Sequence, residues 1–123
     1  MRALVIDDSR TVRAVIGTIL KELGIEVVQA GDGREGLEQL RRWPDVELIL
    51  VDWNMPVMNG LDFILAVRGQ RAYDGVRILM VTTETESDQV TRALRAGANE
   101  YLMKPFNRDV LVAKLSLMDV LAE

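Results

Sequence analysis

Five short apolar runs recur along the chain, and most of them are continuous rather than alternating in polarity. They span residues 2–6, 25–30, 48–51, 77–81 and 100–103. A continuous apolar run of this length is typical of a parallel strand that is covered on both of its faces. The pattern therefore predicts five strands of one parallel sheet.

Amphipathic segments alternate with these runs. The clearest one begins after Ser9, a residue type that caps helix N-termini, and ends before Gly24, which suits the position just past a helix. Its apolar positions recur at helical spacing, and they are Val12, Val15, Ile16, Ile19, Leu20 and Leu23. Several independent signals thus predict a first helix here.

The next two helices are predicted at residues 34–42 and 60–68. The earlier of the two carries an internal glycine and is stopped by Pro44. Asp32 lies in the Gly-Asp-Gly segment 31–33, which is typical of a turn.

A fourth helix is predicted after Ser87 or Asp88, either of which can cap it, and Gly97 ends it. Asn107 can cap a fifth helix, which we expect to run nearly to the C-terminus. Five strand-helix units in this order predict a doubly wound α/β fold with helices on both faces of the sheet. The flavodoxin-like strand order 2-1-3-4-5 is expected.

Composition supports one folded domain spanning residues 1–123. The chain has 123 residues, of which 49% are hydrophobic and 28% charged, so it can bury a sizeable core. Its 15 basic and 19 acidic residues give a net charge of −4, which argues against direct binding to nucleic acid. The absence of cysteine and histidine excludes disulfides, soft-metal sites and imidazole catalysis.

No basic leader or cleavage signal opens the sequence, and no apolar stretch approaches the length of a membrane span. We therefore expect a cytoplasmic protein without membrane insertion.

Polar residues follow the apolar runs at the points where ligands bind in doubly wound sheets. Asp7 and Asp8 come after the first run, Asp52 after the third, Thr82 after the fourth and Lys104 after the fifth. The carboxyl ends of parallel strands meet at one edge of the sheet, so these side chains should lie together.

Each of these residues alone has an ordinary explanation: an Asp after a strand commonly caps a helix or forms a turn, and a Lys is commonly solvated. Their joint placement favours a site. Three neighbouring carboxylates repel one another unless a cation lies among them, and Mg²⁺ prefers such oxygen ligands. Asp52 can then act as a nucleophile toward phosphorus, with Thr82 and Lys104 contacting the transferred oxygens.

Four segments carry a resemblance that spans the whole chain. They read Val-Ile-Asp-Asp-Ser at 5–9, Val-Asp-Trp-Asn-Met-Pro-Val-Met-Asn-Gly at 51–60, Val-Thr-Thr-Glu at 81–84 and Tyr-Leu-Met-Lys-Pro-Phe at 101–106. In order and spacing, the chain resembles the receiver domains of two-component response regulators, of the CheY-like chemotaxis type.

The resemblance implies a phosphorylation-activated switch. Asp52 matches the phosphoacceptor, and Asp8 and Asp52 match the Mg²⁺ ligands, together with the backbone carbonyl of Asn54. Asp7 would act on the metal mainly through water. Lys104 would pair with the acceptor carboxylate and then with the phosphoryl group, and a cis peptide is expected between it and the following proline.

The resemblance also implies a switch pair and two tuning positions. The Thr82 hydroxyl would move toward the phosphoryl group while the Tyr101 ring turns inward. Asn54 and Glu84 match the positions that control access of the hydrolytic water, and their polarity suggests a signal that decays fairly quickly.

The implied partners are a histidine kinase and a downstream target, bound through the face made by the fourth helix, the fifth strand and the fifth helix. Alternatively, the chain is a receiver excised from a longer regulator whose output module lies beyond Glu123. An Mg²⁺-dependent phosphatase of the haloacid dehalogenase type would need Asp-x-Asp, whereas Asp7 and Asp8 are adjacent. In a flavodoxin-like flavin binder, the same two carboxylates would repel the FMN phosphate.

The fifth helix carries two apolar stripes. One is expected to pack on the sheet, and its members are Leu111, Leu115, Met118 and Ala122. A second, formed by Val110, Leu117 and Leu121, either covers a neighbouring helix or contacts a target, an output module or a second copy in an activation-dependent dimer.

Overall fold

Five parallel strands form one sheet in the order β2-β1-β3-β4-β5, as predicted. The structure is a computed structural model that describes residues 1–83 and 87–121. In chain order the elements are β1 (Arg2–Ile6), α1 (Arg10–Glu22), β2 (Glu26–Ala30), α2 (Gly33–Arg42), β3 (Val46–Asp52), α3 (Gly60–Arg68), the 3₁₀ helix η1 (Arg71–Tyr73), β4 (Arg77–Thr82), α4 (Ser87–Ala96), β5 (Glu100–Met103) and α5 (Arg108–Leu117). In the part of the chain described, no helix is long and apolar enough to cross a membrane.

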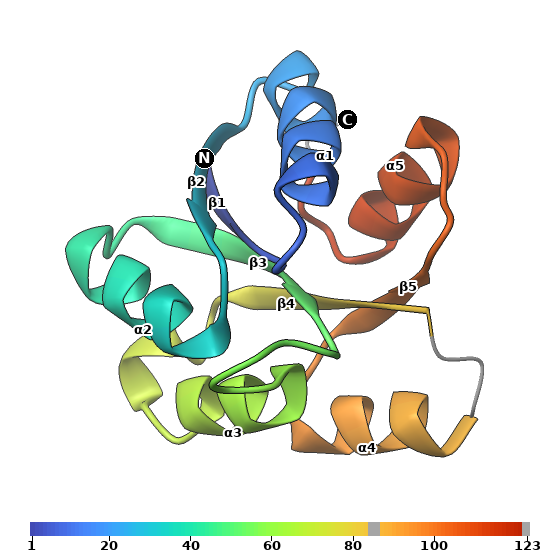
Figure 1. Cartoon of the computed structure of the whole chain (residues 1–123). Helices are drawn as coiled ribbons and strands as arrows, with labels where there is room; N and C mark the ends of the chain where they lie inside the picture. The colour runs from blue at the N-terminus through green and yellow to red at the C-terminus, as the bar shows by residue number, and fades with distance from the viewer. Residues whose placement is uncertain (84–86, 122–123) are drawn as a thin grey trace.

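The sheet is the middle of three layers. Helices α1 and α5 cover one face, and α2, α3 and α4 cover the other (Figure 1). Successive residues of β3 alternate between the two sides: Ile49 and Val51 enter the core beneath α2, α3 and α4, while Leu48 and Leu50 enter the core beneath α1 and α5. Burial on both faces explains why the strands read as continuous apolar runs.

Polar residues cap three of the helices, and the caps of α1 and α5 are the predicted ones. Ser9, Asn59 and Asn107 each accept a hydrogen bond from a backbone N–H in the first turn of α1, α3 and α5, respectively. Asp32 does the same for α2, because its side chain accepts from the backbone N–H of Glu35 at 2.8 Å. It is therefore a helix N-cap as well as a turn residue.

The start of α4 differs from the prediction. Ser87 and Asp88 both lie inside the helix, so neither is its N-cap. The residue before Ser87 falls outside the described part of the chain. Gly97 follows the helix with a φ of +121°, a left-handed conformation that suits glycine, so the predicted stop is correct.

The end of α5 also differs. The helix stops at Leu117 rather than running nearly to the C-terminus, and the backbone N–H of Val120 turns back to the carbonyl of Leu115 at 3.2 Å. Leu121 consequently packs against the core and leaves the predicted second stripe. Val110 and Leu117 remain on the surface, 43% and 69% exposed. Ala122 lies outside the described residues.

Candidate functional site

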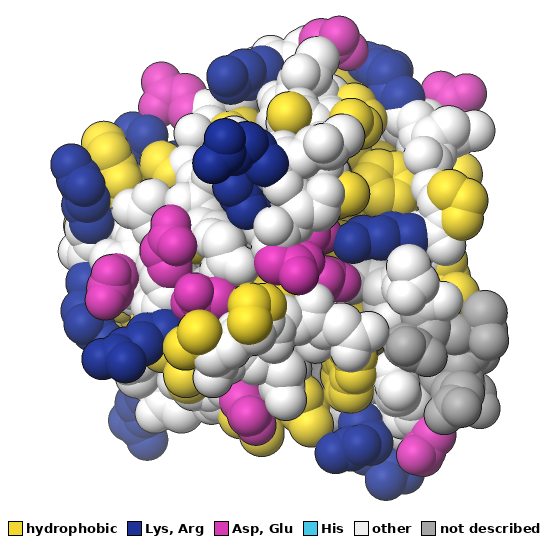
Figure 2. Space-filling view, viewed as in Figure 1, with side chains coloured by type: hydrophobic (Ala, Val, Ile, Leu, Met, Phe, Trp, Pro, Cys, Tyr) yellow, Lys and Arg dark blue, Asp and Glu magenta, His cyan; other side chains and the backbone are white. Residues whose placement is uncertain are grey.

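The carboxyl ends of four strands bring the predicted site residues together. Asp7 follows β1, Asp52 ends β3, Thr82 ends β4 and Lys104 follows β5. Asp7, Asp52 and Thr82 are buried, whereas Asp8 is exposed. Acidic side chains gather at the middle of the face that Figure 2 shows, with basic side chains around them.

The three carboxylates form a compact acidic pocket. One oxygen each of Asp7, Asp8 and Asp52 can be chosen so that all lie within 4.8 Å of one another. Hard divalent cations such as Mg²⁺ prefer carboxylate oxygens, and a cation here would offset the mutual repulsion of the carboxylates. The donor set therefore fits Mg²⁺, with the Asn54 backbone carbonyl in the loop that follows Asp52 as a further predicted ligand.

Lys104 supplies a positive charge to this pocket. Its ammonium lies 2.7 Å from Asp7 Oδ2 and 3.5 Å from Asp52 Oδ1, so it bridges the two buried carboxylates. The resemblance implied a pairing of Lys104 with Asp52, which is present, and Asp7 is a second and closer partner. A cis peptide joins Lys104 to Pro105, as expected from the resemblance.

Burial is the main reason that Asp52 resists ionisation. Loss of hydration, followed by repulsion from Asp7, raises the pKa of Asp52 to about 6, and attraction to Lys104 partly opposes this rise. The carboxylate is still mostly ionised at neutral pH, as a nucleophile must be. A bound cation would add to the effect of Lys104 and lower this raised pKa.

The loop between β3 and α3 is packed tightly around the acceptor position. A Cβ on Gly60 would collide with the carbonyl oxygen of Asp52, so only glycine fits where α3 begins. Val57, in the same loop, has a φ of +68°, a left-handed conformation that is unusual for a β-branched residue. Trp53 is partly buried against the core, and Asn54 is exposed.

Arg13 is a site neighbour that sequence reasoning missed. Its guanidinium donates from Nη1 to the backbone carbonyl of Asp7 and from Nε to Gln29 Oε1 at 3.1 Å. It thereby anchors the loop that carries Asp7 and Asp8. Arg13 lies on a helix with other polar residues, so the sequence holds no signal that separates it from an ordinary surface arginine.

The predicted switch residues lie on neighbouring strands. Thr82 ends β4 and is fully buried, and its backbone carbonyl accepts from the N–H of Lys104 at 2.8 Å. Tyr101, on β5, is half-buried and packs against the core on the α4 side of the sheet. Glu84, the second predicted tuning residue, lies outside the described residues.

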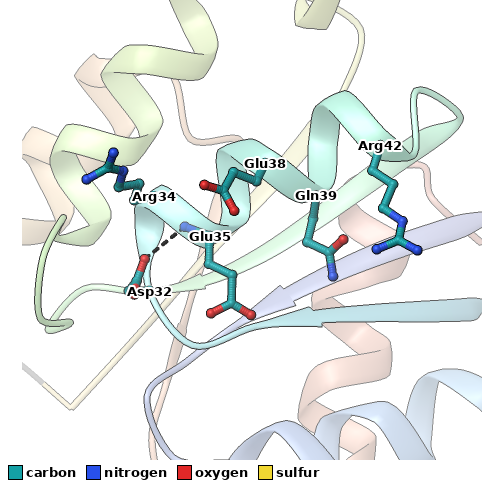
Figure 3. A pocket seen from close by; sticks show the side chains of 6 residues that line it. All are labelled: Asp32, Arg34, Glu35, Glu38, Gln39 and Arg42. Atoms are coloured by element: carbon teal, nitrogen blue, oxygen red, sulfur yellow. Dashed lines mark hydrogen bonds between the residues drawn. The ribbon is translucent and has the colours of Figure 1, made fainter.

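A separate hollow runs along α2 (Figure 3), and it is lined by Asp32, Arg34, Glu35, Glu38, Gln39 and Arg42. Two of these residues have structural partners: Asp32 caps the helix, and Gln39 Nε2 donates to the backbone carbonyl of Gln29 at 2.9 Å. The hollow is the surface of one helix, and it takes no side chain from the acidic pocket.

Comparison with known proteins agrees with this geometry. The family model described as the response regulator receiver domain matches residues 3–116. A chemotaxis protein CheY homolog of Campylobacter jejuni is 44% identical over 116 residues, covering 94% of this chain and 89% of that protein. Chemotaxis protein CheY1 of Helicobacter pylori is 43% identical over 119 residues, covering 96% of both chains.

Solved structures match the fold equally well. Vibrio cholerae chemotaxis protein CheY4 superimposes with a TM-score of 0.89 at 38% identity, covering 95% of this chain and 97% of that chain. The chain therefore belongs to the response regulator receiver domains of the CheY type, the phosphorylation-activated switches of two-component signalling.

Proposed function

We propose that Asp52 is the phosphoacceptor and that the domain takes its phosphoryl group from a histidine kinase or from a small acyl phosphate. The observation that carries this proposal is a buried carboxylate at the end of the central strand β3, with a lysine ammonium 3.5 Å away and two more carboxylates beside it. An Asp52 oxygen forms the new bond to phosphorus while the bond between phosphorus and the leaving group breaks.

The other site residues neutralise charge around this reaction. Lys104 offers its ammonium, and Thr82 its hydroxyl, to the oxygens of the transferred group. Asp8, Asp52 and the Asn54 carbonyl would hold Mg²⁺, with Asp7 acting through water. The metal would neutralise negative charge on the phosphoryl oxygens. The chain itself thus promotes its own phosphorylation and later the hydrolysis of the acyl phosphate. Its role is regulatory, and it acts on no separate substrate.

Lys104 must leave Asp7 before its ammonium can contact a phosphoryl group on Asp52. In the structure it is held mainly by Asp7 at 2.7 Å, and a phosphoryl group on Asp52 would compete with Asp7 for its ammonium. Attraction of Lys104 and Thr82 to that group is the differential interaction that can shift the domain between two states. Thr82 and Tyr101 are the proposed switch pair.

An apolar cleft beside the site suits a protein phosphodonor. Its volume is about 410 Å³, and it lies between α1 and the loop after β5, with Lys104 and Thr83 in its wall. The remaining lining residues are Thr11, Val12, Val15, Pro105 and Phe106. A histidine-bearing surface that buries this cleft would bring its phosphoryl group next to the acceptor.

The proposed output surface is the face formed by α4, β5 and α5. Leu94 on α4 and Val110 and Leu117 on α5 are 42%, 43% and 69% exposed. This face would bind a downstream target, an output domain of the same protein, or a second activated copy. Since the relatives named above are chemotaxis proteins, we propose a chemotaxis target and a cytoplasmic location first.

The lifetime of the phosphorylated state is proposed to depend on Asn54 and Glu84. Both follow site residues by two positions, Asp52 and Thr82 respectively. Bulkier side chains at these positions would obstruct the water that attacks the acyl phosphate, so hydrolysis should slow while phosphorylation still occurs.

Intact-mass spectrometry tests the central proposal. With phosphoramidate and Mg²⁺, the wild type should gain one phosphoryl group and Asp52→Asn should gain none. Glu38→Gln, on the exposed side of α2, is the matched control and should be labelled like the wild type. Equal labelling of Asp52→Asn and the wild type would contradict the assignment.

A further inference from the structure

Lys114 reaches from α5 onto the proposed switch aromatic. Its ammonium lies 4.2 Å from the centroid of the Tyr101 ring, within the range of a cation–π contact. The same ammonium lies 3.2 Å from Glu100 Oε1, and that oxygen also accepts a 3.0 Å hydrogen bond from the backbone N–H of Tyr101. Three groups on two elements therefore hold one another in place.

This arrangement is partly shielded from water. The side chains of Lys114 and Glu100 are 21% and 23% exposed, so their attraction is weakened less by solvent than that of an open surface pair. The aliphatic stem of a lysine also covers apolar surface when its charged end is held. Helix α5 packs on one face of the sheet, and the Tyr101 ring packs on the other. Because β5 is the edge strand, no further strand separates Lys114 from the ring.

We propose that Lys114, anchored by Glu100, is a positioning residue that holds the Tyr101 ring in its half-buried orientation and so opposes the switch. The inference rests on the proposed function in one respect, that Tyr101 turns when Asp52 is phosphorylated. When the ring turns inward, its face leaves the ammonium, and the contact is lost in the activated state. Removing Lys114 therefore makes activation easier.

Beryllofluoride with Mg²⁺, which stands in for the phosphoryl group on Asp52, gives the first test. The chain has two tyrosines, so 3-fluorotyrosine labelling yields two ¹⁹F resonances, and Tyr73→Phe identifies that of Tyr101. The apparent affinity for beryllofluoride, followed through the Tyr101 resonance, should rise up to about five-fold in Lys114→Met, the size of one cation–π contact. Glu100→Gln should act in the same direction.

Two variants separate positioning from general damage. Lys114→Arg keeps a cation that can stack on the ring and pair with Glu100, so it should behave like the wild type. Lys21→Met removes an exposed lysine near the end of α1 and should change nothing. The proposal is wrong if Lys114→Met leaves the affinity unchanged, or if Lys114→Arg shifts it as much as Lys114→Met does.

A double-mutant cycle tests the contact without beryllofluoride. In urea unfolding, each of Lys114→Met and Tyr101→Leu changes the equilibrium constant of unfolding. The change in the double variant should differ by about five-fold from the product of the two single changes. Additive effects would overturn the proposal. If the wild type binds no beryllofluoride but the cycle shows coupling, the phosphoacceptor proposal has failed and the contact between Lys114 and Tyr101 stands.

Discussion

The Lys104 ammonium donates a 2.7 Å hydrogen bond to the Asp7 carboxylate, across the carboxyl ends of β5 and β1. These two residues are 97 positions apart in the chain, and their side chains are 16% and 3% exposed. A nearly dry ion pair is costly to break from one side, because the remaining charge is left buried. Loss of this bond should therefore lower the stability of the domain.

Lys104→Met should lower the free energy of unfolding by about 3 kcal/mol in EDTA at neutral pH, because Asp7 and Asp52 lose their shared cation. Mg²⁺ replaces part of that positive charge, so it should stabilise the variant more than the wild type. Urea unfolding with and without Mg²⁺ measures both effects. An equal Mg²⁺ increment in the two proteins would contradict the expected role of Lys104.

Mg²⁺ should change the fluorescence of Trp53, which directly follows Asp52. The Trp43→Phe background leaves Trp53 as the single reporter, since the chain has two tryptophans. Asp8→Asn removes one proposed ligand and should weaken Mg²⁺ binding at least about ten-fold, the scale of losses at metal sites. Glu38→Gln is the control. A fluorescence titration in which Asp8→Asn binds like the wild type would place the metal elsewhere.

The pKa of Asp52 predicts a pH dependence in the metal-free protein. Because the folded-state pKa is about 6 and the ordinary value is 3.8, the folded state holds its proton more tightly than the unfolded state. The stability from this group is present below about pH 4 and is lost as the pH rises through about 6, by about 3 kcal/mol in all. In Asp52→Asn, the free energy of unfolding should change less with pH over this range.

Urea unfolding in EDTA between pH 4 and pH 8 makes the comparison, with both proteins at equal ionic strength. Other carboxylates titrate in the same range, so the difference between wild type and Asp52→Asn is the quantity to follow. A difference that stays constant between pH 4 and pH 8 would show that the pKa of Asp52 is not raised in the folded state.

Val57 is expected to be a strained position. Its φ of +68° is unfavourable for a β-branched side chain, and 76% exposure leaves it little packing to lose. Asparagine tolerates this conformation, so Val57→Asn should raise the free energy of unfolding by about 1 kcal/mol. Val15→Asn, at an exposed helical position, should bring no such gain. Thermal unfolding of the two variants decides this, and a loss of stability in Val57→Asn would refute it.

The fold was predictable because its signals are local. Apolar runs and cap residues such as Ser9 and Asn107 each mark one element, and the handedness of strand-helix-strand units then limits the topology. The site was predictable for a related reason: parallel strands end at one edge, so the residue after each strand is placed by the topology alone.

The rest depends on contacts between distant segments, which no local pattern reports. Arg68, in the last turn of α3, donates to the backbone carbonyls of Gly97, Tyr73 and Val76 and so ties the connection between α3 and β4 to the loop after α4. Burial lowers the pKa of its guanidinium. The early end of α5 has the same kind of cause, since burial of Val120 turns the chain inward after Leu117.

Borohydride trapping identifies directly which residue carries the phosphoryl group. Reduction converts an aspartyl phosphate to homoserine, and peptide mass spectrometry then locates it in the chain. After treatment with phosphoramidate and Mg²⁺, homoserine should appear at position 52, and EDTA should prevent its formation. Homoserine at position 7 or 8, or in equal amounts with EDTA present, would contradict the assignment of Asp52 as a metal-dependent phosphoacceptor.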